Sequence, residues 1–81
     1  MQRQSSTQSN NPDLEALGRA IRAIRKQQGL SQEALADIAG IDRSHMGRIE
    51  RGERNVTILN ILRVSQALEC SASDLFRHAG L

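Results

Sequence analysis

Aliphatic residues recur at helical spacing along most of this chain. Leu17 and Ile21 are four residues apart, and further aliphatic residues flank them at similar spacing, with basic and polar residues between. Positions three and four residues apart share one face of an α-helix, so this stretch predicts an amphipathic helix. The helix is expected to start at Pro12, after the capping residue Asn11, and to stop at Gly29.

Four more helices are predicted from capping residues and glycine stops. Serine, threonine and aspartate side chains accept hydrogen bonds from the free N–H groups at a helix start, and glycine often ends a helix. No segment shows sustained strand alternation, and Phe76 is the only aromatic residue, which favours helices over a sheet. The expected caps are Ser31, Asp42, Thr57 and Ser71 with Asp74, and the expected stops of the two short helices are Gly40 and Gly52.

The length of 81 residues allows one modest hydrophobic core, so the prediction is a single all-α domain of five helices over residues 12–81. Residues 1–11 read MQRQSSTQSNN and contain no aliphatic residue after Met1. A segment this polar cannot offset the entropy lost on ordering, which predicts a disordered tail. A minor-groove arm that carries Arg3 is the alternative for this tail.

The basic residues are unevenly placed, although the formal charge is only +2. Two groups dominate: Arg19, Arg22, Arg25 and Lys26, then Arg43, Arg48, Arg51 and Arg54. Only Arg77 is basic after Arg63, so one part of the fold is expected to be cationic while the C-terminal end is not. A cationic surface favours a polyanionic partner, with a solvated helix face as the alternative.

Several function classes are disfavoured by what the chain lacks. Cys70 is the only cysteine, so no intramolecular disulfide is possible, and with only two histidines no metal site is predicted. No catalytic triad spacing or phosphate-loop pattern is present, so we expect no enzyme and no cofactor. The chain has no apolar run of about 20 residues and no secretory signal, which predicts a soluble, cytoplasmic protein without membrane contact.

The two short predicted helices, 32–39 and 43–51, are separated only by Gly40-Ile41-Asp42. Two short helices joined by a tight turn form a helix-turn-helix, in which the first helix braces the second against DNA. This motif needs a small residue at the helix crossing, a glycine at the turn and aliphatic residues on the inner face. Ala36, Gly40, Met46 and Ile49 have the required spacing.

Three segments, Ser31-Gln32-Glu33-Ala34-Leu35-Ala36, Gly40-Ile41-Asp42-Arg43-Ser44 and Ile49-Glu50-Arg51-Gly52, resemble the phage lambda repressor/Cro family of regulators. The resemblance covers residues 17–76. Within it, residues 42–44 together with residues 49–57 are similar in particular to controller proteins of restriction-modification systems, and many other small repressors share them. It implies a lambda-repressor-like domain that binds double-stranded DNA and regulates transcription.

The outward face of the second helix of the motif carries the candidate base readers. With Met46 and Ile49 inward, a rotation of about 100° per residue turns residues 43, 44, 47, 48 and 51 outward. The planar guanidinium of arginine can pair with O6 and N7 of guanine, worth about 1–3 kcal/mol of discrimination. The predicted base readers are Arg43, Ser44, Gly47 and Arg48. Gly47 would permit close approach to DNA, and relief of packing is the alternative.

Phosphate contacts are expected at two places. Ser31 and Gln32 open a helix whose N-terminal amides can donate to an anion, and they resemble the phosphate clamp of the family. The resemblance implies a second clamp at Arg54, Asn55 and Thr57. Arg51 is a further candidate, with a purely solubilising role as the alternative.

The resemblance also implies an ion pair between Arg25 and Glu50 beneath the recognition helix. Such a pair would hold the helix in register. The alternative for Arg25 is a phosphate contact.

Helix-turn-helix proteins usually bind as two-fold dimers on near-palindromic sites, and this chain has apolar residues beyond those that one core needs. The predicted dimer interface comprises Leu59, Leu62, Leu75, Phe76 and Leu81. A monomer with a slightly apolar surface is the alternative. RNA polymerase is a further expected partner if the protein regulates its own gene.

Two other functions remain open from the residues alone. The same fold serves as an antitoxin or anti-repressor module that mainly binds a partner protein, and Leu59 and Leu62 would permit that role. RNA binding is disfavoured because the chain lacks stacking aromatics. DNA binding through several phosphates should weaken steeply as salt rises, whereas an apolar protein interface should not.

Overall fold

Five α-helices follow one another in residues 11–81, the part of the chain that the computed structural model describes. They are α1 (Pro12–Gln27), α2 (Gln32–Ala39), α3 (Arg43–Glu50), α4 (Ile58–Ala67) and α5 (Ala72–Ala79). This part of the chain contains no strand, so the all-α prediction is confirmed. The predicted tail lies outside the described residues except for Asn11, which caps α1.

The helix starts lie where the capping residues predicted them. The Asn11 side chain accepts a hydrogen bond of 2.9 Å from the backbone N–H of Asp13, and Ser71 and Asp74 form a reciprocal capping box on α5. Ser31, Asp42 and Thr57 cap the three helices between them. Each cap satisfies N–H groups that a helix start would leave without partners.

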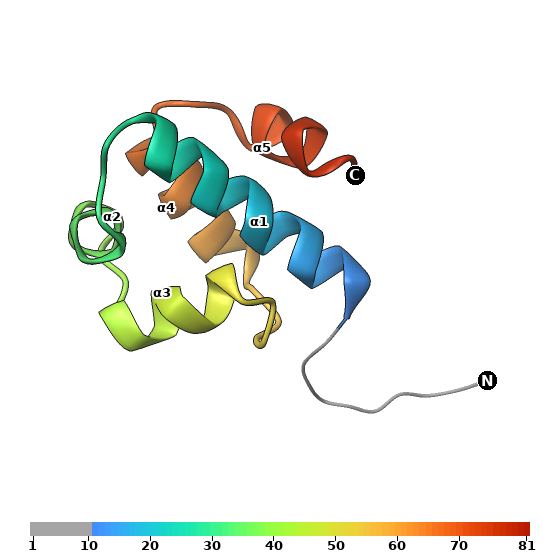
Figure 1. Cartoon of the computed structure of the whole chain (residues 1–81), viewed down its shortest axis with the longest axis horizontal. Helices are drawn as coiled ribbons and strands as arrows, with labels where there is room; N and C mark the ends of the chain where they lie inside the picture. The colour runs from blue at the N-terminus through green and yellow to red at the C-terminus, as the bar shows by residue number, and fades with distance from the viewer. Residues whose placement is uncertain (1–10) are drawn as a thin grey trace.

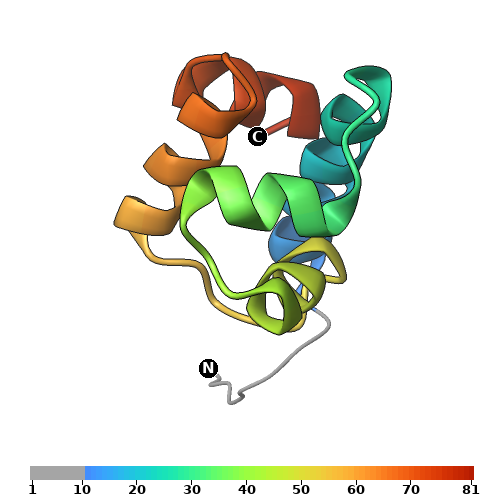
Figure 2. The ribbon, with the colours of Figure 1, turned by 90° about the vertical axis from the view of Figure 1, so that its left-hand side faces the viewer.

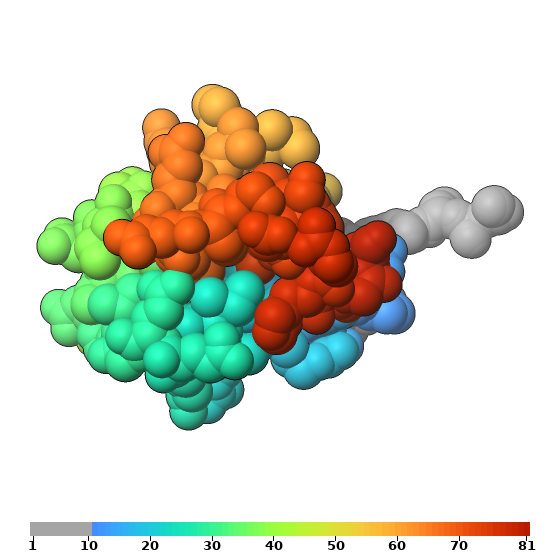
Figure 3. Space-filling view, turned by 90° about the horizontal axis from the view of Figure 1, so that it is seen from above, coloured from blue at the N-terminus to red at the C-terminus, as the bar shows by residue number. Residues whose placement is uncertain are grey.

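The core is built from one face of each helix. Figure 1 shows α1 running through the middle of the molecule, with α3 below it and α5 above it. Seen from above, α4 and α5 lie side by side with part of α1 next to them (Figure 3). The largest fully buried side chains are Ile21, Leu35, Met46, Ile49, Val64, Leu68 and Leu75. Burying one such side chain stabilises the fold by about 1.5–3 kcal/mol.

Two glycines allow α1 to contact the C-terminal end of α3 backbone to backbone. A Cβ at Gly18 would lie 2.4 Å from the carbonyl oxygen of Glu50, which no backbone can accommodate. A Cβ at Gly52 would lie 2.7 Å from Cα of Glu15, and Gly52 also has a φ of +74°. This contact packs the C-terminal end of α3 closely against α1. The sequence predicts Gly52 only as a helix stop, and no local signal in it marks Gly18.

Candidate functional site

The helix-turn-helix of α2 and α3 is held together by its inner side chains. Figure 2 shows α2 crossing the front of the molecule with α3 below it, joined by a short turn. Gly40 ends α2 in the left-handed conformation, with a φ of +71°. Ala36, Met46 and Ile49 are buried between the helices, in the roles that the spacing predicted.

The opposite face of α3 carries polar side chains at the protein surface. Arg43, Ser44 and Arg48 are all exposed, and the Arg43 side chain retains 68% of its accessible surface. A short helix with a buried inner face and a row of hydrogen-bonding side chains on the outer face can enter a DNA major groove. Three of the four predicted base readers therefore lie together on one exposed surface.

Gly47, the fourth predicted base reader, is buried. A Cβ at this position would lie 3.2 Å from Nη1 of Arg51 and 3.2 Å from Oε1 of Gln32. The side chains of these two residues therefore cover Gly47. This position favours the packing alternative over close approach to DNA.

The N-terminal end of α3 is organised by Asp42. Its carboxylate accepts hydrogen bonds from the Ser44 hydroxyl, the Ser44 backbone N–H at 3.1 Å and the His45 backbone N–H. The hydroxyl, followed by the His45 N–H, holds the pKa of Asp42 below its usual value. The Ser44 proton is thus engaged by the cap, and the hydroxyl oxygen remains able to accept a hydrogen bond from a base.

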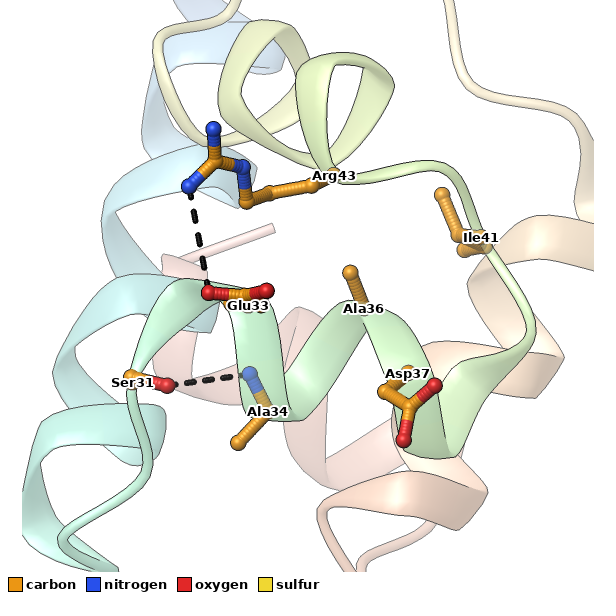
Figure 4. Close-up of a pocket in the computed structure, with 7 residues that line it drawn as sticks. All are labelled: Ser31, Glu33, Ala34, Ala36, Asp37, Ile41 and Arg43. Atoms are coloured by element: carbon orange, nitrogen blue, oxygen red, sulfur yellow. Dashed lines mark hydrogen bonds and ion pairs between the residues drawn. The ribbon is translucent and has the colours of Figure 1, made fainter.

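An open groove of about 520 Å³ lies along α2 and the turn that follows it, with Arg43 at the start of α3 on its edge. Figure 4 shows Arg43 reaching across it toward Glu33, with Asp37 and Ile41 further along the groove. Nη1 of Arg43 lies 3.9 Å from Oε1 of Glu33, and both side chains are more than two-thirds exposed. Solvent screens such a pair, which leaves Arg43 free to rearrange.

A buried ion pair lies beneath the exposed face of α3, between the two residues that the resemblance implied. Nε of Arg25 donates to Glu50 at 2.7 Å and Nη2 donates at 3.0 Å, and the two side chains are only 9% and 3% exposed. Nη1 of Arg25 also donates to the carbonyl of Leu30 at 2.9 Å. Since Arg25 is enclosed by these partners, the alternative role as a phosphate contact is disfavoured.

Gln32 joins this network from α2. Its Nε2 donates to Oε1 of Glu50 at 3.0 Å, so one carboxylate ties together α1, α2 and α3. One N–H of the amide is used in this way and the other remains for a ligand. The Ser31 hydroxyl accepts from the N–H of Ala34 at 3.0 Å and is exposed beside it.

The connection between α3 and α4 brings the second group of expected phosphate contacts to the surface. Arg54, Asn55 and Thr57 are all exposed, and Thr57 also caps α4. Arg51 forms a two-point ion pair with Glu53, which the sequence analysis did not single out. The sequence signal for this ion pair is Glu53, a single acidic residue among closely spaced arginines.

The expected dimer interface divides into exposed and buried residues. Leu59, Leu62 and Leu81 are exposed, with Leu59 at 65%. Phe76 is half-buried against the core. Leu75 is 0% exposed, so its assignment to the interface is wrong: it packs in the core that α5 shares with α1 and α4.

Two exposed apolar residues were missed by the sequence analysis. Ile38 on α2 and Ile58 on α4 retain 59% and 70% of their accessible surface. Ile58 lies three residues before the buried Ile61, a spacing that would place it on the same helix face, yet its side chain is exposed.

Other chemistry finds little support in residues 11–81. No three metal-ligating side chains cluster there, and no helix there is long and apolar enough to cross a membrane. Cys70 is half-buried against the core, and burial, followed by the nearby Asp74 charge, raises its thiol pKa. A raised pKa lowers the fraction of the thiol that is present as reactive thiolate, in keeping with an inert packing role.

Comparisons with known proteins agree with this geometry. A helix-turn-helix family model matches residues 21–75. Control protein C.SmaI of Serratia marcescens is 40% identical over 67 residues, which are 83% of this chain and 80% of that protein. The competence pilus inhibition repressor of Acinetobacter baylyi is 33% identical over 74% of this chain and 54% of its own length. The crystal structure of the restriction-modification controller protein C.AhdI from Aeromonas hydrophila has a TM-score of 0.79 and 45% identity, covering 80% of this chain and 98% of that one.

Proposed function

Because the chain belongs to the helix-turn-helix family and is a sequence-specific DNA-binding transcription regulator rather than an enzyme, we propose that it reads bases with the exposed face of α3. The observation that carries this proposal is the row of Arg43, Ser44 and Arg48 on a helix whose inner face is locked to α1 and α2. The two arginines would pair with guanine edges. Ser44 would accept a hydrogen bond from a base.

Phosphate contacts on both sides of the reading helix would supply most of the affinity. On one side, the amides at the start of α2 and the remaining N–H of Gln32 would donate to a phosphate, with Ser31 exposed next to them. On the other side, the candidates are Arg51, Arg54, Asn55 and Thr57. All of these except the half-buried Gln32 are exposed.

The proposed active form is a homodimer. Leu59, Leu62 and Leu81 are exposed and Phe76 is half-buried, and a second copy would cover these apolar side chains. A two-fold dimer would place its two copies of α3 about 34 Å apart, one turn of DNA, on a near-palindromic site.

The proposed biological role is control of a restriction-modification system. C.SmaI is named a control protein and C.AhdI a restriction-modification controller protein, and both are similar to this chain over most of its length. Such a regulator would act in the cytoplasm. Contact with RNA polymerase would follow where its operator adjoins a promoter.

Selection of binding sites from random duplex DNA at two salt concentrations tests this function. The expected result is enrichment of one near-palindromic sequence, with retention that falls steeply as salt rises. Sedimentation of the free protein should show a dimer that Leu59→Glu dissociates. An absence of any enriched sequence would contradict the proposed reading face. Salt-insensitive capture of a protein partner in place of DNA would favour the antitoxin or anti-repressor alternative.

A further inference from the structure

Glu53 lies among the arginines at the C-terminal end of α3. Nε of Arg51 donates to its Oε2 at 2.9 Å, and Nη2 of Arg51 donates to Oε1 at 3.3 Å. The side chains are 58% and 42% exposed, so the pair lies at the surface. This two-point geometry is the one in which an arginine also binds a phosphate group.

The backbone places Glu53 at this position. Gly52 adopts a positive φ and turns the chain, and the Glu53 N–H donates to the carbonyl of Arg48 at 2.9 Å. The turn is pressed against Glu15 of α1, where no side chain larger than hydrogen fits at position 52. The carboxylate is therefore directed back toward Arg51 by a turn that the packing of α1 on α3 fixes.

The carboxylate stays charged in this environment. The hydrogen bond from Arg51 is the main cause that lowers the pKa of Glu53, and the charges of Arg48 and Arg54 add to it. An anion thus lies inside the group of residues to which the proposed function assigns phosphate contacts. Exposed ion pairs contribute little to folding, so the pair is not needed to hold α3 in place.

We propose that Glu53 acts as an internal phosphate mimic: it occupies Arg51 in the free protein and thereby weakens binding to any DNA sequence. This inference rests on the proposed function, because it requires Arg51 to contact a phosphate in the complex. A DNA phosphate must displace the carboxylate, which is then left near the phosphate and takes up a cation. The net number of counterions released on binding is therefore smaller than the number expected from the phosphates that the basic side chains contact.

The test compares Glu53→Gln with Asp74→Asn in fluorescence anisotropy titrations over a series of salt concentrations. Both substitutions remove one negative charge from an exposed arginine pair, and Asp74 belongs to α5, which lies on the opposite side of α1 from α3 (Figure 1). The probes are the duplex selected from the random pool and an unrelated duplex of equal length. Urea unfolding of each variant checks that it is folded.

Glu53→Gln is expected to tighten binding to both duplexes by about fivefold, leaving their affinity ratio unchanged. The slope of log K against log salt should steepen by about 0.9, as for one additional phosphate contact. Asp74→Asn should leave this slope unchanged. In an Arg51→Gln background, the effect of Glu53→Gln should disappear, because the carboxylate acts through that arginine.

Equal effects of Glu53→Gln and Asp74→Asn would overturn the inference while leaving the proposed function in place. The same conclusion would follow if the gain persisted in the Arg51→Gln background. A wild-type protein that binds both duplexes equally, without steep salt dependence, would overturn the proposed function and this inference together.

Discussion

The two faces of α3 have different chemistry although the helix contains only eight residues. Met46, Ile49 and Glu50 face inward, where they are buried and held by α1 and α2. Arg43 and Arg48 face outward and are held by no buried contact. The side chains that hold the fold and the proposed base readers thus lie on different faces of one helix, and substitutions on the two faces should have separable effects.

The largest expected effect is the loss of the buried ion pair. Glu50→Ala would leave the enclosed guanidinium of Arg25 without its carboxylate, which should lower the free energy of unfolding by about 3–5 kcal/mol. Urea unfolding followed by circular dichroism measures this. Glu53→Ala removes the carboxylate of an exposed pair and serves as the control, with little expected change. Equal losses of unfolding free energy in the two variants would show that the buried pair stabilises the fold no more than the exposed pair does.

The next effect in size concerns the contact between α1 and α3. Gly18→Ala would force a Cβ against the backbone carbonyls of Ile49 and Glu50 and should destabilise the protein by about 3 kcal/mol. Gly47→Ala is the matched control, since its Cβ would meet only the movable ends of Gln32 and Arg51. It should change stability by no more than about 1 kcal/mol, because alanine also favours the helix. Thermal unfolding of both variants checks the difference, and a stable Gly18→Ala protein would contradict the backbone contact.

Substitution on the outward face should affect binding alone. Arg43→Ala should reduce discrimination between the selected duplex and one with a changed base pair by about 1–3 kcal/mol, with no shift in the urea midpoint. Arg43→Lys keeps the charge and removes the planar fork, so it should keep affinity for unrelated DNA and lose the discrimination. Competition titrations measure both quantities. A lowered midpoint in either variant would assign Arg43 a structural role as well.

The smallest expected effect lies at the cap that joins the two faces. The pKa of Asp42 is lowered in the folded protein, so its contribution to stability is present above the ordinary value of 3.8 and is lost as pH falls through the lowered value. Asp42→Asn should therefore flatten the fall of the unfolding temperature below about pH 4. Ser44→Ala removes the main cause of the shift and should flatten that fall in part, because the folded pKa of Asp42 then lies closer to its ordinary value. Identical acid profiles for wild type and Asp42→Asn would show that protonation of Asp42 is not coupled to folding.

Local signals made much of the fold predictable from the sequence. A capping side chain accepts hydrogen bonds from N–H groups no more than three residues away, so the local sequence is enough to predict the caps Asn11, Ser31 and Asp42. Gly40 ends α2 through its own left-handed backbone conformation, which is equally local. The Arg25–Glu50 pair joins residues far apart in the sequence, and only the family resemblance gave access to it.

Features that depend on packing between distant segments were not predictable. Leu75 and Phe76 are adjacent apolar residues in α5, and only the placement of α5 against α1 and α4 decides that Leu75 is the one fully buried. Gly18 lies in a regular helix, and nothing local marks it as the contact point for α3. Gly47 faces outward by helical rotation, yet the long side chain of Gln32 reaches over it from α2.

The most direct test of the separation between the two faces is site selection with matched double variants. Arg43→Ala/Arg48→Ala removes two arginines from the outward face of α3, and Arg19→Ala/Arg77→Ala removes two exposed arginines from α1 and α5. The α1 and α5 variant should enrich the wild-type consensus while the α3 variant enriches none, and both should unfold like wild type. Recovery of the same consensus by the α3 variant would contradict the assignment of base reading to this face.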